Sequence, residues 1–268
     1  MEPEESIVRL PRSPRSASRV GWLVLALAFS AGGLRGQETP ATPIFVSART
    51  LTQAALHVPA GIGEGDRVTL FVALHGYGGS ASTFARIGEL LSESGVVAAL
   101  PQAAHPVTFE NGSRGFDWTL ASVPDTGLHR RATELAVLEQ LPQLMAELRR
   151  RFEVDRAFVM GFSQGAVIAL LVGLYRPDLF DGTATFGLPG FDPSWFPDGT
   201  LQAGAGVRVW IGHGAQDARA SPAVSRAAAD FLRSAGLSVT EHSFEGGHAI
   251  PTDALEAMVA WSRGSGDP

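Results

Sequence analysis

The 268-residue sequence contains no cysteine and no lysine, so all 21 of its basic residues are arginines. The missing cysteines exclude a thiol nucleophile, a disulfide framework and a cysteine-ligated zinc site. The missing lysines exclude a P-loop phosphate site, a Schiff-base lysine and a Ser-Lys catalytic pair. Covalent catalysis by this chain would therefore have to use Ser, Thr, Asp, Glu, His or Tyr.

A basic stripe is also missing. The formal net charge is −6, with 45% hydrophobic and 18% charged residues, which is ordinary for a globular protein. An acidic chain without a basic stripe argues against nucleic acid as a partner, because binding to nucleic acid requires clustered positive charge. The sequence does not indicate an oligomeric state.

The N-terminal segment is typical of a secretion signal. Four arginines between residues 9 and 19 precede the apolar run Val20–Ala31, and small residues follow it. A membrane-spanning helix needs about 20 apolar residues, so this shorter run favours a signal peptide over residues 1–36. An uncleaved membrane anchor is the alternative. We expect a linker over residues 37–43, a secreted or periplasmic protein, and no stable membrane span after cleavage.

Residues 44–268 are expected to form one α/β domain. Short apolar runs alternate with segments of helical periodicity, a pattern typical of βαβ units and of a mainly parallel sheet with helices on both faces. The predicted strands are Val68–Leu74, Val96–Leu100, Phe158–Phe162, Val207–Ile211 and Val239–Phe244. The predicted helices are Ser82–Ser94, Leu128–Phe152, Ala166–Tyr175, Pro222–Ala235 and Pro251–Trp261. An antiparallel edge is expected near Ile44–Ser47 and Leu51–Val58.

A G-x-S-x-G motif lies between a predicted strand and a predicted helix. It reads Gly161-Phe162-Ser163-Gln164-Gly165. In this context the chain must turn sharply, and the two glycines relieve the crowding on either side of the serine. The following helix adds positive potential at its N-terminus. The motif predicts Ser163 as a nucleophile; the alternative is an ordinary helix cap.

A serine nucleophile needs a base and an orienting carboxylate. His248 follows the last predicted strand in Gly246-Gly247-His248, late in the chain as the order Ser, Asp or Glu, His requires. Asp217 follows the predicted strand Val207–Ile211 and falls between the serine and the histidine. Asp181 is the rival carboxylate, although it is more consistent with a residue that flanks a strand.

Acyl transfer also needs two donors for the oxyanion. The backbone amide of Gln164, directly after Ser163, is the first expected donor. The second is expected from the glycine-rich segment His75-Gly76-Tyr77-Gly78-Gly79, at the amide of Tyr77. We interpret His75 as a structural residue that braces this loop.

Taken together, these motifs resemble the phospholipase/carboxylesterase family of the α/β-hydrolase fold. Its members include acyl-protein thioesterases and lysophospholipases, and the motifs are also similar to those of secreted feruloyl-esterase-like and polyhydroxybutyrate-depolymerase-like enzymes. The resemblance covers roughly residues 65–262 and depends on the GFSQG, HG and GGH elements together. The sequence departs from it after Asp217, where Ala-Arg-Ala-Ser-Pro replaces the usual early Val-Pro.

The resemblance implies hydrolysis of carboxylic esters or thioesters through an acyl-enzyme on Ser163, without a metal or other cofactor. The expected partner is a small-molecule or lipid ester. The resemblance also implies that Trp118 contacts substrate, although a Trp that anchors a loop is equally consistent. Three alternatives stay open: a lysophospholipase or thioesterase for long acyl chains, a peptidase or acyltransferase, and a non-catalytic binding module on a relic hydrolase fold.

Overall fold

The computed structural model describes residues 53–120, 127–197 and 199–264. The predicted signal peptide, linker and strand Ile44–Ser47 lie outside these residues and stay predictions. Within the described ranges, no helix has the length and apolar character needed to cross a membrane.

A seven-stranded sheet forms the centre of the fold, in the order β1-β3-β2-β6-β7-β8-β9. All neighbouring strands run parallel except β1, which pairs antiparallel with β3 at one edge. This arrangement confirms the expected mainly parallel sheet and its antiparallel edge. The strands are β1 (Ala54–His57), β2 (Arg67–Leu74), β3 (Val97–Pro101), β6 (Glu153–Phe162), β7 (Gly182–Phe186), β8 (Arg208–Gly214) and β9 (Val239–Phe244).

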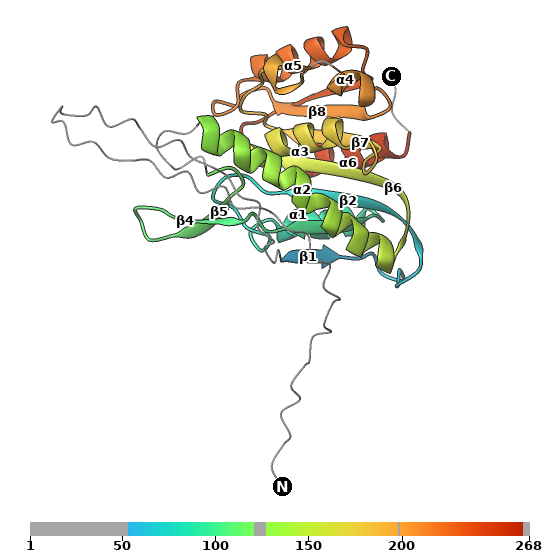
Figure 1. The fold of residues 1–268 in the computed structure, drawn as a ribbon. Coiled ribbons are helices and arrows are strands. Elements are labelled where there is room, and N and C mark those ends of the chain that lie inside the picture. The colour runs from blue at the N-terminus through green and yellow to red at the C-terminus, as the bar shows by residue number, and fades with distance from the viewer. Residues whose placement is uncertain (1–52, 121–126, 198, 265–268) are drawn as a thin grey trace, which may run out of the picture. The chain divides into compact units, whose positions relative to one another are not determined.

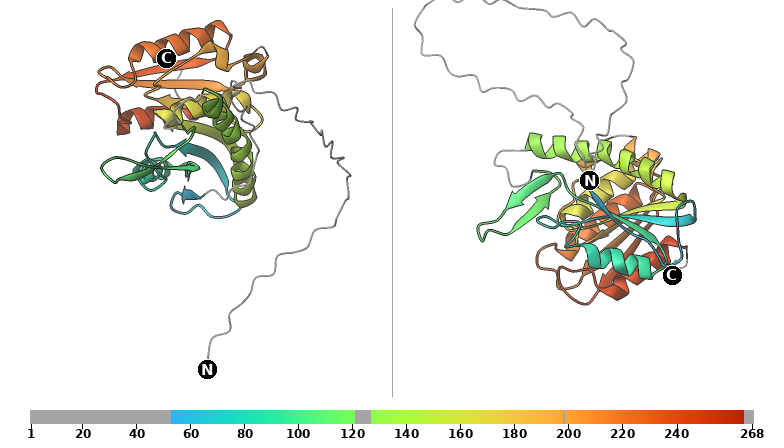
Figure 2. Two further views of the ribbon diagram at one scale, coloured as in Figure 1. Left: turned by 60° about the vertical axis from the view of Figure 1, so that its left-hand side comes forward. Right: turned by 90° about the horizontal axis from the view of Figure 1, so that it is seen from below.

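Helices cover both faces of the sheet, as the strands between two layers of helices in Figure 2 show. One face carries α1 (Ala85–Glu93) and α6 (Thr252–Ser262). The other carries α2 (Gly127–Arg151), α3 (Gln164–Tyr175), α4 (Thr200–Ala203) and α5 (Pro222–Ser234). A short 3₁₀ turn, η1 (Pro193–Trp195), lies between β7 and α4 in the chain.

The central strand β2 shows why the apolar runs predict the sheet. Successive side chains of a strand point to opposite faces. Leu70 and Val72 accordingly join the core beneath α2 and α3, whereas Phe71 and Ala73 join the core beneath α1 and α6. A strand buried on both faces therefore reads as a continuous apolar run.

A two-stranded hairpin projects from the body at the left of Figure 1. It consists of β4 (His105–Thr108) and β5 (Arg114–Asp117), paired antiparallel. The sequence patterns did not predict this hairpin or the central strand β7. Both lack an apolar run: β7 reads Gly-Thr-Ala-Thr-Phe, and β5 reads Arg-Gly-Phe-Asp.

Candidate active site

Ser163 occupies a sharp turn between a strand and a helix. Strand β6 ends at Phe162 and α3 begins at Gln164, so one residue makes the whole change of direction. Its backbone has φ 53° and ψ −118°, a conformation that costs a residue other than glycine about 1–3 kcal/mol. The amide of Ser163 donates to the carbonyl of Phe186 on β7 at 2.9 Å, which helps hold the turn. Ser163 thus lies at the carboxyl end of the parallel sheet.

The two glycines of the motif are required by the close approach of backbone segments. A Cβ atom added to Gly161 would overlap the carbonyl of Gly165. A Cβ atom added to Gly165 would overlap the carbonyl of Leu74 and lie 2.6 Å from that of His75. The loop after β2 therefore packs directly on the turn that carries Ser163.

Asp217 and His248 form a hydrogen-bonded pair on neighbouring loops. The Nδ1 atom of His248 lies 2.7 Å from Oδ2 of Asp217, and the Asp217 side chain is 1% exposed. The other carboxylate oxygen of Asp217 accepts from the amides of Arg219 and Ala220, both at 2.8 Å. The segment that departs from the family pattern after Asp217 thus supplies the donors that fix this carboxylate.

The Asp217 carboxyl stays ionised because its hydrogen bonds outweigh its burial. Burial alone would raise its pKa, but the Ala220 amide, His248 and the Arg219 amide together lower the pKa below the ordinary value. The carboxylate therefore carries its negative charge at neutral pH and can accept a hydrogen bond from a protonated Nδ1 of His248. With the proton on Nδ1, the Nε2 atom is left as a hydrogen-bond acceptor.

The loops that carry Asp217 and His248 are joined by Gln216. Its amide donates to the carbonyl of Gly246 at 2.9 Å, and its side-chain oxygen accepts from the Gly246 amide at 2.6 Å. Its side-chain nitrogen donates to Glu245 at 2.8 Å. A Cβ atom on Gly214 would overlap the carbonyl of Gly247. These contacts fix the separation of the two loops and hence of the carboxylate and the imidazole.

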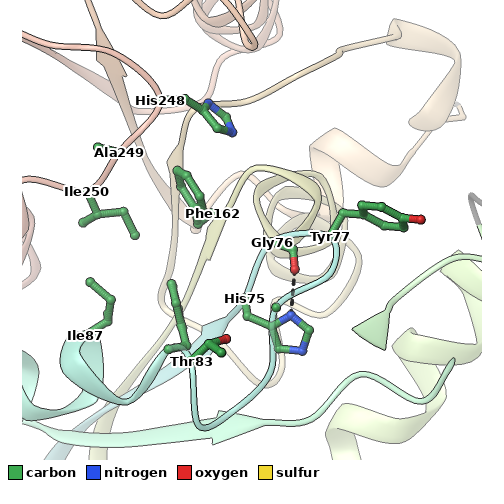
Figure 3. Close-up of a pocket in the computed structure, with 11 residues that line it drawn as sticks. His75, Gly76, Tyr77, Thr83, Ile87, Phe162, His248, Ala249 and Ile250 are labelled. Carbon is green, nitrogen blue, oxygen red and sulfur yellow. Dashed lines mark hydrogen bonds between the residues drawn. The ribbon is translucent and has the colours of Figure 1, made fainter. Parts of the chain in front are cut away.

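A cavity of about 350 Å³ opens beside His248. Figure 3 shows the His248 ring next to that of Phe162, and the ring centroids are 4.6 Å apart. Gly76 lines the same cavity, and a Cβ atom added to it would lie 3.3 Å from Cβ of Ser163. The serine, the histidine and the cavity are therefore immediate neighbours. The apolar part of the wall comprises Phe84, Ile87, Phe162, Ala249 and Ile250.

Comparison with known proteins supports the same reading. The model of the Phospholipase/Carboxylesterase family matches residues 62–262. Acyl-protein thioesterase 1 of Schizosaccharomyces pombe is 27% identical over 203 residues, covering 72% of this chain and 88% of that protein. The crystal structure of esterase PE8 has a TM-score of 0.62 at 24% identity, covering 80% of this chain and 99% of that one. The Bacillus cereus carboxylesterase has a TM-score of 0.56 at 21% identity, covering 80% and 95%. The chain belongs to the phospholipase/carboxylesterase family.

Family membership confirms the resemblance, the α/β-hydrolase fold and the enzyme class predicted from the sequence. The chain is a serine hydrolase of the carboxylesterase or thioesterase type. The roles assigned to individual residues remain predictions. The structure brings Ser163, Asp217 and His248 together at one end of the sheet. Among the described residues, no group of three or more His, Asp or Glu is suited to hold a metal ion.

In this carboxylesterase-family chain, Asp181 lies at the opposite end of the sheet from Ser163. It precedes β7 and its carboxylate accepts from the amide of Ala157 at 2.8 Å. The Asp181 amide in turn donates to the carbonyl of Ala157 at the same distance. Asp181 therefore flanks a strand, and the contact with His248 belongs to Asp217.

Trp118 lies beneath the loop after β2. Its side chain is in the core, with the residue 3% exposed, and its indole nitrogen donates to the carbonyl of His75 at 2.8 Å. It does not line the cavity beside His248. The structure thus shows the loop-anchoring alternative, and a contact between Trp118 and substrate stays a prediction that this placement does not favour.

His75 braces the loop that carries the expected second oxyanion donor. It is 1% exposed, with Nδ1 2.8 Å from the carbonyl of Gly76 and Nε2 accepting from the amide of Ala103 at 3.2 Å. Burial lowers the pKa of His75, and the Gly76 carbonyl opposes this only in part. The ring is therefore neutral, with its proton on Nδ1, and holds the carbonyl next to Tyr77.

Proposed function

We propose that the chain is an exported serine carboxylesterase that hydrolyses carboxylic esters with small organic groups through an acyl-enzyme on Ser163. The observation that carries the proposal is the Asp217–His248 pair, joined at 2.7 Å and placed beside the strained Ser163 turn. The ring of His248 uses Nδ1 for Asp217, which leaves Nε2 to accept the proton of Ser163.

The chemistry proceeds in two halves. His248 removes the proton from Ser163 as Oγ attacks the ester carbonyl, and the amides of Tyr77 and Gln164 stabilise the oxyanion. The tetrahedral intermediate collapses, and His248 returns the proton to the leaving alcohol. Water then attacks the acyl-enzyme with His248 as base, which releases the acid and restores Ser163. Asp217 holds the imidazole and stabilises its charged form.

The size of the cavity supports a small substrate group. Its volume of about 350 Å³ is close to the lower limit of about 300 Å³ for small-molecule pockets. Its apolar wall suits a short hydrocarbon chain, whereas a long acyl chain would extend beyond it. A thioesterase activity is the second candidate, because a relative that is 27% identical is named acyl-protein thioesterase 1.

A panel of p-nitrophenyl esters from acetyl to palmitoyl tests the small-substrate proposal. We expect the highest kcat/KM with short chains, and a shift of the optimum to longer chains in Ile87→Ala, which enlarges the cavity. Leu138 of α2 is partly buried and packs on the core away from the cavity lining, so Leu138→Ala should leave the chain-length optimum unchanged. A palmitoyl optimum in the unmodified enzyme would contradict the proposal and favour a lipid substrate. Thioester analogues of the best substrate decide between ester and thioester preference.

Export is proposed from the leader sequence alone, namely the arginines and the apolar run within residues 1–36. We expect the mature protein to be recovered outside the cytoplasm with a new N-terminus near residue 37. N-terminal sequencing of the protein from cell fractions checks this. An intact Met1 on cytoplasmic protein would contradict export, and an intact Met1 in the membrane fraction would indicate the uncleaved anchor.

A further inference from the structure

The two expected oxyanion donors come from separate loops, and one short segment contacts both. This segment, Phe116–Thr119, contains the end of β5 and the two residues after it. The carbonyl of Phe116 accepts from the amide of Gly78 at 2.9 Å, and the amide of Phe116 donates to the carbonyl of Gly79 at 2.9 Å. The backbone directly after Tyr77 is thus paired with the hairpin.

The same segment also binds the side chain of Gln164. The amide of Trp118 donates to Oε1 of Gln164 at 3.2 Å. The Nε2 atom of Gln164 donates to Oδ1 of Asp117 at 2.6 Å and lies 3.0 Å from Oγ1 of Thr119. Every polar atom of the Gln164 side chain therefore has a partner within Phe116–Thr119, which fixes the residue whose amide follows Ser163.

Asp117 is the residue in this segment that needs an explanation. It is fully buried, and its Oδ1 accepts from Gln164 and from the amide of Thr119 at 2.9 Å. Its Oδ2 is buried with no hydrogen-bond partner, and no ion pair reaches it within the described residues. His105, opposite it in the hairpin, is the titratable group that interacts with it. A buried carboxylate without a cation is costly, so a purely structural site would favour a neutral residue.

We infer that Asp117 is a positioning residue for the oxyanion hole, an inference that rests on the proposed serine esterase chemistry. Asp117 orients Gln164, and the same strand carries the backbone pairing that fixes the loop of Tyr77. The backbone amides of Tyr77 and Gln164 are thereby fixed relative to each other before the substrate binds. Donors that are fixed in advance stabilise the transition state most, since they need no reorganisation during the reaction.

The test compares Asp117→Ala with the conservative Asp117→Asn, which keeps an oxygen for Gln164 and Thr119. We expect Asp117→Ala to lower kcat by about 10²-fold, the lower end of the loss of one oxyanion donor, with little change in KM. Affinity for a methyl trifluoromethyl ketone, whose adduct with Ser163 places an oxyanion in the same position, should fall in parallel. Asp117→Asn should restore most of both quantities.

Two further variants separate positioning from folding. Gln164→Leu removes the same link but keeps the backbone amide, so it should reproduce the effect, and the double variant with Asp117→Ala should be no slower than the slower single variant. Thr183→Val removes a buried hydrogen bond to the carbonyl of Ala169, and neither residue lines the cavity. This variant should reduce stability without changing kcat. If Asp117→Ala does not fold, Gln164→Leu gives the same comparison.

Wild-type kcat and ketone affinity in both Asp117→Ala and Gln164→Leu would overturn the positioning role. So would losses of activity that follow the loss of folded protein alone, as measured against Thr183→Val. A Ser163→Ala enzyme that kept its turnover would instead overturn the proposed chemistry itself. The two failures are therefore distinguishable.

Discussion

Replacing Ser163 with alanine is expected to lower kcat/KM for the best ester substrate by about 10⁴- to 10⁶-fold. The Oγ atom is the proposed nucleophile, and neither Asp217 nor His248 can replace it as an attacking group. The free energy of unfolding should change by less than about 0.5 kcal/mol, because Oγ caps no helix amide in the structure and the positive φ of 53° persists in alanine. Steady-state kinetics and urea unfolding of the same preparations measure both quantities.

Ser234→Ala is the matched control for this substitution. Ser234 is an exposed residue at the end of α5, and its hydroxyl donates only to the carbonyl of Phe231. This variant should retain full activity and remain reactive toward an active-site phosphonate, whereas Ser163→Ala should not be labelled. Full esterase activity in Ser163→Ala would contradict the acyl-enzyme proposal. A folded wild-type protein that neither turns over esters nor reacts with the phosphonate would favour the binding module.

The parts of the fold that the sequence predicted well are those in which burial follows from local pattern. The predicted strand Val239–Phe244 coincides with β9, and the predicted helix Pro222–Ala235 differs from α5 by one residue. In α5 the side chain of Ser221 caps the helix and Pro222 occupies its first position. The two residues at the start of the helix therefore determine where it begins. Boundaries of this kind are determined by residues next to each other in the chain, so they can be predicted from a single sequence.

Strand β7 was missed because its stability comes from contacts distant in the chain. Its buried Thr183 donates from Oγ1 to the carbonyl of Ala169 on α3 at 2.8 Å. A Cβ atom on Gly173 would lie 2.5 Å from Cβ of Thr183, so only glycine allows α3 to approach the strand this closely. A polar pentapeptide becomes a central strand through these partners, which no periodicity reveals.

The candidate site likewise has features that follow from local sequence and features that depend on contacts between distant segments. The GFSQG motif predicted the turn at Ser163, since its glycines are needed wherever a strand turns directly into a helix. Asp217 and Asp181 both fall between Ser163 and His248 in the chain, so the choice of Asp217 followed from its place after the predicted strand Val207–Ile211. The three-dimensional contact with His248 was needed to separate the two carboxylates. The link between Asp117 and Gln164 spans 47 residues and depends on the register of an unpredicted hairpin, so the sequence patterns gave no sign of it.

The Asp217–His248 contact determines which nitrogen of the neutral imidazole carries the proton. The carboxylate can only accept at Oδ2, so Nδ1 of His248 must carry the proton and Nε2 must be the acceptor. An asparagine at position 217 would keep an oxygen for the amides of Arg219 and Ala220. Its amino group would then face Nδ1, and the ring would place its proton on Nε2 instead. A neutral His248 in that form cannot take the proton of Ser163.

Asp217→Asn is therefore expected to lower kcat by about 10⁴-fold while the protein stays folded. Because the pKa of Asp217 is lowered in the folded state, its charge stabilises the fold above the unfolded pKa, and this contribution is lost as pH falls through the folded pKa. The variant should thus be less stable than wild type at neutral pH, and urea unfolding should show the difference narrowing in acid. Asp181→Asn, which keeps an acceptor for Ala157, should retain wild-type kcat. A large loss in Asp181→Asn with an active Asp217→Asn would reverse the assignment, because the carboxylate that orients His248 would then be the one at the far end of the sheet.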